Sequence, residues 1–261
     1  MFGLFRPRAP QKPAAAHVDV AHDGKVYRVA LKRVATARRF TLRVRSATQD
    51  VVLTLPPRGS LSAARAFALR HAAWIGARLD RLPRVVPFEA GARVPFRGVE
   101  HAIVHCPQRR GPVWTDAAAD GSPLLCAAGD SAHLARRIAD YMKREARRDL
   151  TAAVARHTAA LGLPARAVGL RDTTSRWGSC SASGSLNFSW RLIMAPPQVL
   201  DYLAAHEVAH LLHLDHSPRF WEVVRRLSAE VDRAEAWLKA HGAGLHRFGE
   251  KKASPLREIA P

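Results

Sequence analysis

Hydrophobic and polar residues alternate with a period near two over the first part of the chain. Four stretches show this alternation, which is typical of strands with one buried face. Their apolar positions are Val18 and Val20; Tyr27, Val29 and Leu31; Phe40, Leu42 and Val44; and Val51, Leu53 and Leu55. Asp23-Gly24 has the composition of a hairpin turn, and Pro56-Pro57 ends the last stretch. We predict a small antiparallel sheet here.

The middle of the chain changes to helical spacing, then to strands, then back to helical spacing. Ser60 is a candidate N-cap of a helix over residues 61–82. The apolar residues available for its buried side are Phe67, Trp74, Ile75 and Leu79. A second β stretch, interrupted by glycines, follows from residue 85 to residue 126. Apolar residues three and four apart then predict a long helix from Ser131 that ends at Gly162.

The last third repeats this change of period. An alternation predicts a half-buried strand whose apolar members are Leu186, Phe188, Trp190 and Leu192. Pro196-Pro197 ends the strand and precedes a helix from about Gln198 to Leu212. Ser217 is an N-cap candidate, and Pro218 at the first helical position begins another helix. The predicted order of this part is therefore helix, hairpin, helix.

Composition and cysteine usage narrow the class of protein. The 261 residues are 48% hydrophobic and 24% charged, as in globular proteins. The three cysteines have no Cys-x-x-Cys spacing, which favours a reducing compartment and excludes a cysteine-based zinc site. The apolar run at residues 1–5 is too short for a signal peptide, and no later run has the length of a membrane span. We expect a cytoplasmic protein without a membrane partner.

The formal net charge of +19 makes nucleic acid a candidate partner. The basic residues are dispersed along the chain, however, and a dispersed excess is more typical of a solvated surface. The same interpretation applies to the basic face of the long helix, which carries Arg136, Arg137, Lys143, Arg144, Arg147 and Arg148.

The candidate chemistry lies in the helix of residues 198–212. His206 and His210 are four residues apart, so both imidazoles lie on one helix face and can reach one ion. Glu207 is rotated by roughly 100° around the helix, where it can reach a water on the open side of that ion. A catalytic zinc ion has three protein ligands and one open position. We therefore predict a Zn²⁺ site with Glu207 as the general base.

The third ligand has several candidates, of which His216 is the best placed. It lies in the predicted bend between two helices, where the chain can turn a side chain back toward the metal. His213 is two turns from His206 on a straight helix, a poor geometry for one tetrahedral ion. Glu222 or Glu230 would correspond to zinc enzymes with a glutamate as the third ligand. Asp215 could hydrogen-bond a ligand imidazole, although a surface position at the helix end is the simpler interpretation.

The segments Arg176–Ser181 and Leu186–Ile193, followed by His206-Glu207-x-x-His210, His216-Ser217 and Phe220-Trp221, resemble the YgjP-like metallopeptidase family, which is related to the SprT-like zinc proteases. The similarity extends over most of residues 17–240. It implies a zinc-hydrolase domain in which His206, His210 and His216 bind the metal and Glu207 is catalytic. The better-known proteases with this histidine spacing have glycine at the position of His213, so the bend toward His216 must here come from Leu214 and Asp215.

Several functions are compatible with this resemblance. Family members are described as peptidases and as a nucleotide pyrophosphatase acting on UTP. A nucleic-acid-associated SprT-like protease or binding module is a further alternative. A peptide substrate could pair with the predicted strand 186–192 as an edge strand, which makes Asn187 and Arg191 candidates for the cleft. Arg176 and Arg191 could instead bind phosphates. We expect a zinc-dependent peptidase acting on peptides or unfolded protein, with the nucleotide and nucleic-acid functions as alternatives.

These elements predict an α+β fold in which an antiparallel β-rich region precedes a compact zincin-like catalytic domain. The boundaries we predict are a disordered tail at residues 1–16, the β-rich region at residues 17–128, the catalytic domain at residues 129–245 and a basic tail at residues 246–261.

Overall fold

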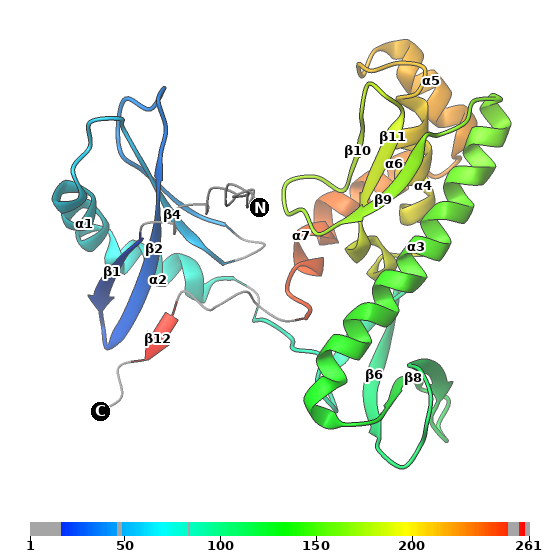
Figure 1. Ribbon diagram of the computed structural model, residues 1–261, viewed down its shortest axis with the longest axis horizontal. Coiled ribbons are helices and arrows are strands. Elements are labelled where there is room, and N and C mark those ends of the chain that lie inside the picture. The colour runs from blue at the N-terminus through cyan, green and yellow to red at the C-terminus, as the bar shows by residue number, and fades with distance from the viewer. Residues whose placement is uncertain (1–16, 46–48, 83, 250–255, 259–261) are drawn as a thin grey trace, which may run out of the picture. The chain divides into compact units, whose positions relative to one another are not determined.

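The chain folds as two units. A computed structural model describes residues 17–45, 49–82, 84–249 and 256–258 (Figure 1). The first unit is formed by residues 1–82 together with residues 253–261, and the second by residues 83–252. The tail predicted at residues 1–16 lies outside the described residues. Within them, no helix combines the length and the apolar character needed to cross a membrane.

The first unit contains a mixed sheet with the strand order β1-β2-β4-β3, and a last strand pairs with β2. The strands are β1 (His17–His22), β2 (Lys25–Arg33), β3 (Thr41–Val44), β4 (Val51–Leu55) and β12 (Leu256–Glu258). The predicted strands are confirmed, but the prediction of a purely antiparallel sheet is wrong because β2 and β4 are parallel. The connection over residues 34–40 carries the chain to the outer edge, so that β3 forms there and β4 returns between β3 and β2.

The helix predicted over residues 61–82 is two helices, α1 (Leu61–Arg70) and α2 (Ala72–Asp80), separated at His71. The predicted cap is confirmed, because the Ser60 hydroxyl accepts a hydrogen bond from the Ala63 backbone N–H at 3.1 Å. Ile75 is fully buried against the sheet. The assignment of Trp74 to the buried side is wrong, since 47% of this residue is exposed. It lies on the other face of α2.

The second unit begins with a four-stranded sheet of order β5-β6-β8-β7. Its strands are β5 (Arg93–Phe96), β6 (Val99–Cys106), β7 (Trp114–Ala117) and β8 (Pro123–Ala128). A short 3₁₀ turn, η1 (Ser131–His133), then leads into the long helix α3 (Leu134–Leu161). The predicted stop is confirmed, because Gly162 caps α3 with a left-handed φ of 67°. Figure 1 shows α3 running from β6 and β8 at its first turns to β9 farther along.

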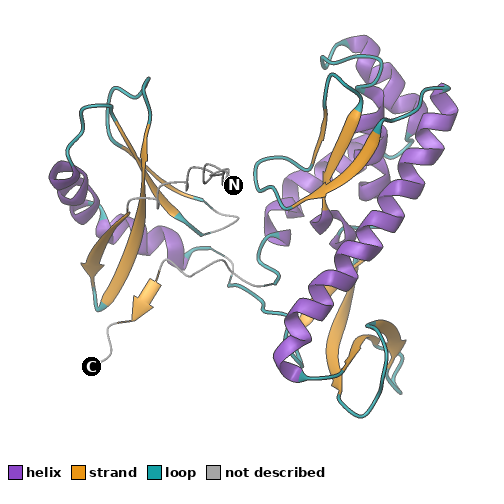
Figure 2. Ribbon diagram, viewed as in Figure 1, coloured by secondary structure: helices purple, strands orange, loops and turns teal. Residues whose placement is uncertain are grey.

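A three-stranded sheet of order β10-β11-β9 follows α3. Its strands are β9 (Ala167–Arg171), β10 (Gly178–Cys180) and β11 (Ser185–Ser189), and they lie beside the helices in Figure 2. The predicted edge strand 186–192 is corrected in two respects. It ends at Ser189, because the buried residues that follow form the 3₁₀ turn η2 (Trp190–Met194). It is also the central strand, paired on both sides, so the two edges of this sheet are β10 and β9.

The remaining helices close the second unit. They are α4 (Pro197–Ala209), α5 (Pro218–Leu227), α6 (Val231–Trp237), the π turn η3 (Leu238–Gly242) and α7 (Ala243–Leu245). The predicted helix 198–212 therefore ends three residues earlier than expected. The start of the next helix is confirmed, because the Ser217 hydroxyl accepts a hydrogen bond from the Phe220 backbone N–H at 3.4 Å.

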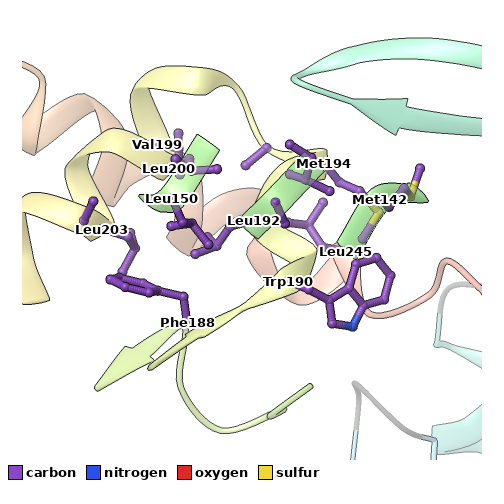
Figure 3. Packing of buried hydrophobic residues seen from close by; sticks show 14 of the residues in the cluster. Met142, Leu150, Phe188, Trp190, Leu192, Met194, Val199, Leu200, Leu203 and Leu245 are labelled. Carbon is purple, nitrogen blue, oxygen red and sulfur yellow. The ribbon is translucent and has the colours of Figure 1, made fainter. Parts of the chain in front are cut away.

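One hydrophobic core extends through the second unit, with buried side chains from β5 to α7. Figure 3 shows side chains from α3, β11, η2, α4 and α7 packed together. Ile103 of β6 and Leu125 of β8 belong to the same core. For that reason the chain divides after residue 82 and not at the predicted boundary after residue 128. The predicted tail from residue 246 is corrected as well, because Phe248 is buried in this core and residues 256–258 form β12.

These differences leave the fold class unchanged. The α+β prediction is confirmed, since β1 to β8 precede the long helix α3 and α4 to α7 follow it. Each of the three sheets contains one parallel pair of strands, namely β2–β4, β6–β8 and β9–β11.

Candidate metal centre

Three histidines meet where α4 ends. His206 lies in the last turn of α4 and His210 caps the helix one turn later, so their side chains share one face. His216 lies in the connection between α4 and α5 and turns back onto that face. One ring nitrogen from each of the three residues lies within 4.8 Å of the other two. The predicted trio is therefore assembled, and neither Glu222 nor Glu230 belongs to it.

The donor set fits a tetrahedral metal ion. Two zinc–nitrogen bonds of about 2.0–2.1 Å at the tetrahedral angle place their nitrogen atoms about 3.3 Å apart. The Nε2 atoms of His206 and His216 are 3.2 Å apart. Three imidazoles with room for one further ligand form the donor set of a catalytic site, in contrast to the four protein ligands of a structural site.

Phe220 forms the apolar floor beneath the three imidazoles. Its ring centroid lies 4.9 Å from that of His206, 4.5 Å from that of His210 and 4.8 Å from that of His216. The residue is fully buried in the first turn of α5. Because Ser217 fixes where α5 begins, the same turn fixes both the floor and the position of His216.

The bend that returns the chain to the metal site begins at His210. The backbone N–H groups of Leu212 and His213 both donate to the Ala209 carbonyl, so the chain leaves the α-helical path there and not at Leu214. His210 donates from Nδ1 to the carbonyl of His213 at 2.8 Å, which leaves its Nε2 free for a metal ion. His213 thus contributes its backbone. Asp215 is exposed and accepts a hydrogen bond from the Ser217 N–H.

A buried tyrosine connects His206 to a carboxylate. The Tyr202 hydroxyl donates to Glu235 at 2.7 Å and lies 3.4 Å from the Nδ1 atom of His206. Because the hydroxyl uses its hydrogen in the bond to Glu235, it can only act as an acceptor toward His206. The Nδ1 atom of His206 then carries the hydrogen, which leaves Nε2 available to a metal ion. Burial, and then Glu235, raise the pKa of Tyr202, so the hydroxyl stays protonated.

We expect the substitution Tyr202→Phe to weaken zinc binding by about ten-fold, because it removes the hydroxyl that orients His206 and keeps the ring. Competition with a chromophoric chelator measures the zinc Kd. The matched control is Glu235→Gln, which keeps an oxygen acceptor for the hydroxyl and should weaken binding less. An unchanged Kd in Tyr202→Phe would contradict the positioning role.

Glu207 is a buried carboxylate beside this trio. Only 4% of it is exposed, and its Oε2 atom has no hydrogen-bond partner among the described residues. Burial raises the pKa of Glu207 to about 7, and the charge of Arg176 opposes this shift. Burial and the two neighbouring imidazoles lower the pKa of His206 to about 4, which keeps this ring neutral, as a metal ligand must be.

Gly178 of β10 lies directly against the Glu207 side chain. Any Cβ atom at this position would overlap the carboxylate. A glycine inside a strand often marks such a close approach. Strand β10 can therefore pass beside Glu207 only because residue 178 has no side chain.

The three residues predicted for the substrate cleft are placed differently by the structure. Arg176 is exposed, and its charge acts on Glu207, so it stands beside the site. Asn187 is paired with Ser179 and therefore lies on the sheet face opposite to that of Gly178 and Glu207. Arg191 is 8% exposed and forms an internal ion pair with Asp172 at 2.7 Å. The cleft interpretation does not hold for Asn187 or Arg191.

Arg191 joins three segments of the second unit. Besides the ion pair with Asp172, its guanidinium donates to the backbone carbonyls of Leu245 and Phe248. It also lies over the Trp190 ring, with 4.7 Å between the guanidinium carbon and the ring centroid. The residue thus ties the C-terminal end of the unit to η2 and to the segment after β9.

We expect Arg191→Met to lower the free energy of unfolding by about 3 kcal/mol, because two inward carbonyls and a carboxylate lose their donor. This loss is smaller than the largest losses known for buried ion pairs, because Asp172 is half exposed and can be hydrated. Urea unfolding measures it. The exposed Arg176→Ala should change stability by no more than about 0.5 kcal/mol. Full stability of Arg191→Met with impaired substrate binding would restore the cleft interpretation.

Tyr202, Glu235, Phe220 and Gly178 were not identified from the sequence as parts of the site. Two of them carried a usable signal. Tyr202 precedes His206 by one helical turn, which places it on the same face. Gly178 interrupts a strand-forming segment. Nothing in the sequence connects Glu235, on a separate helix, to the histidines.

Comparisons with known proteins found a matching family and a similar solved structure. The model of a family described as "YgjP-like, metallopeptidase domain" matches residues 38–241, a range that contains the three histidines and Glu207. Among solved structures, the crystal structure of the metallopeptidase zymogen of Pyrococcus abyssi abylysin is similar at 20% sequence identity and a TM-score of 0.33, over 39% of this chain and 99% of that chain. No curated protein matches the chain.

Proposed function

The chain belongs to the YgjP-like metallopeptidase family, and on that premise we propose that it is a zinc-dependent peptidase. His206, His210 and His216 would hold the zinc ion, and Glu207 would act as the general base. The observation that carries this proposal is the Glu207 carboxylate, buried beside the three imidazoles with its Oε2 atom unpaired. A buried unpaired carboxylate is costly to maintain, and such groups occur where chemistry requires them.

Each residue then has a defined task. When bound, a zinc ion lowers the pKa of water toward about 7 and polarises the oxygen under attack. The Oε2 atom of Glu207 accepts a proton from the attacking water. Glu207 then gives this proton to the nitrogen of the leaving amine. Tyr202 keeps His206 in the tautomer whose Nε2 is free. Phe220 excludes water from the far side of the three imidazoles.

The substrate is proposed to pair with β10. This strand forms one edge of its sheet and is the strand that lies against Glu207. An extended peptide can add to such an edge through backbone hydrogen bonds, which would place its amide groups beside the base. Because β11 is enclosed by β10 and β9, it cannot offer an edge.

Nucleotide hydrolysis on the same metal site has less support. A triphosphate needs several cations, and the sequence offered Arg176 and Arg191 for this purpose. Arg191 is buried and already neutralised by Asp172. Only Arg176 of this pair is left exposed beside the site.

An assay of one zinc-loaded preparation on two kinds of substrate separates these functions. Mass spectrometry of an unstructured peptide library reports peptide hydrolysis, and release of pyrophosphate from UTP reports the other activity. We expect peptide cleavage that a chelator abolishes, and we expect no release of pyrophosphate. Pyrophosphate release with intact peptides would contradict the proposal.

A further inference from the structure

A hollow of about 440 Å³ lies on the first unit, far in sequence from the metal centre. It is formed by one face of α2 and by the edge strand β3. The residues that line it are Leu42, Arg43, Val44, Trp74, Ala77, Arg78 and Arg81. We call this surface the Trp74 face. Trp74, Ala77 and Arg78 of α2 and Arg81, its C-cap, recur at three- and four-residue steps, so they share one side of the helix, opposite to the buried Ile75 and Leu79.

The three arginines of the Trp74 face have no carboxylate partner among the described residues. Arg43, Arg78 and Arg81 are exposed and form none of the ion pairs that the described structure contains. The surrounding unit is strongly basic, because residues 17–82 contain thirteen Lys and Arg residues and four Asp residues, without glutamate. Two of these aspartates, Asp19 and Asp80, are already paired with other basic residues. The face therefore presents uncompensated positive charge.

Trp74 adds an accessible aromatic ring to this charge. With 47% of the residue exposed, it is the only tryptophan among the large exposed hydrophobic residues of the described chain. An accessible aromatic ring within a basic groove is a platform on which the bases of a single strand can stack. An aromatic ring flanked by guanidinium groups matches a ligand that combines flat apolar rings with negative charge.

We propose that the Trp74 face binds single-stranded nucleic acid, with bases stacked on Trp74 and phosphates on Arg43, Arg78 and Arg81. Stacking on an aromatic residue within a basic groove is the general way in which proteins bind single strands without sequence preference. A duplex keeps its base faces inside the stack and cannot offer them to Trp74. An apolar protein partner would leave three arginines facing an uncharged surface.

A second basic hollow, on the second unit, lacks an accessible aromatic ring. It measures about 500 Å³ and is lined by Lys143, Arg144, Arg147, Leu170, Arg171, Asp172 and Trp190, so a carboxylate lies among its basic residues. Trp190 is 4% exposed, and Arg191 lies over its ring. This hollow therefore offers positive charge without an accessible ring face. Such a surface suits any anion and does not favour nucleic acid.

Fluorescence anisotropy with the full-length, zinc-loaded protein tests the proposal. The probes are a labelled oligothymidylate of about 12 nucleotides, within the range of single-strand site sizes, an abasic strand of the same length, and a duplex. Wild type should bind oligothymidylate most tightly. Trp74→Ala should weaken oligothymidylate binding by about five-fold or more and leave the abasic strand nearly unaffected, whereas Trp74→Phe should retain most of the affinity.

A matched pair of charge variants separates this face from the net charge. Arg78→Glu with Arg81→Glu should weaken binding and lower the salt dependence, by roughly 0.7 in the slope of log Kd against log salt for each phosphate that the protein no longer neutralises. Arg58→Glu with Arg65→Glu gives the same net charge on exposed positions of the same unit outside the face, and should bind nearly as wild type does.

Three outcomes would overturn the proposal. Equal losses in the two charge variants would mean binding through net charge alone. Equal affinity for the abasic strand would mean that no base stacks on Trp74. Unchanged nucleic-acid binding in Trp74→Ala and in Arg78→Glu with Arg81→Glu would mean that the strand binds elsewhere on the protein. Cleavage of a short peptide by Trp74→Ala should equal that of wild type, so the result stands apart from the proposed peptidase activity.

Discussion

Replacing Glu207 by glutamine is expected to lower peptide hydrolysis by about 100- to 10,000-fold, the contribution of a positioned general base. Glutamine has nearly the same shape and can occupy the buried space beside Gly178, but it cannot accept a proton from water. Because residue 207 is not one of the three clustered imidazoles, the protein should still bind one zinc ion. Steady-state cleavage of a fluorogenic peptide and the bound zinc content are measured on the same sample.

The matched control is Glu222→Gln. Glu222 is a carboxylate on α5 that lies outside the histidine cluster, so this variant should retain full activity and full metal content. Undiminished hydrolysis by Glu207→Gln would remove Glu207 from the mechanism. Loss of zinc together with activity would mean that the carboxylate acts through metal binding and not as a base.

Replacing His216 by alanine is expected to lower zinc affinity by at least 100-fold. The expected loss exceeds the roughly 10- to 100-fold cost of removing a residue that only orients a ligand, because a ligand itself is removed. His216 lies on an exposed connection, so its removal should leave the core intact. Metal analysis after dialysis should find about one zinc per chain in wild type and little in the variant.

The matched control here is His213→Ala, three residues away in the same connection. The structure uses the His213 backbone carbonyl, which alanine also provides, to orient His210. This variant should therefore retain about one zinc ion per chain. If His213→Ala lost the metal and His216→Ala kept it, the assignment of the third ligand would be reversed.

The strength of local signals explains which parts of the fold could be predicted from the sequence. Alternation and caps located most elements, as the Ser60 and Ser217 caps and the Gly162 stop show. Strand order could not be found in this way, because an alternating pattern is the same for an edge strand and a central strand. For that reason β11 was predicted to be an edge, and the parallel pairs were missed.

Trp74 and Arg191 illustrate the same limit for single residues. Helical spacing made Trp74 available for a buried face, but Ile75 and Leu79 already cover the sheet from their side of α2. The position of Arg191 in a predicted edge strand made it a candidate for the substrate cleft. The chain instead turns into η2 at residue 190. This turn carries Arg191 inward, where it contacts Asp172 and the backbone carbonyls of Leu245 and Phe248.

The metal site was more predictable because most of it is local. His206, Glu207 and His210 follow from helical geometry alone, and His216 follows from a predicted helix break close by. The partners that come from other elements, Gly178 and Glu235, depend on tertiary packing that spacing does not encode.

Titration of metal-depleted protein with zinc tests the central claim most directly, with peptide cleavage as the readout. The account predicts negligible hydrolysis without metal and a linear rise to a plateau at about one zinc ion per chain. His216→Ala at the same zinc concentrations should stay near the baseline. Full peptide cleavage by the metal-depleted wild-type protein would contradict the account.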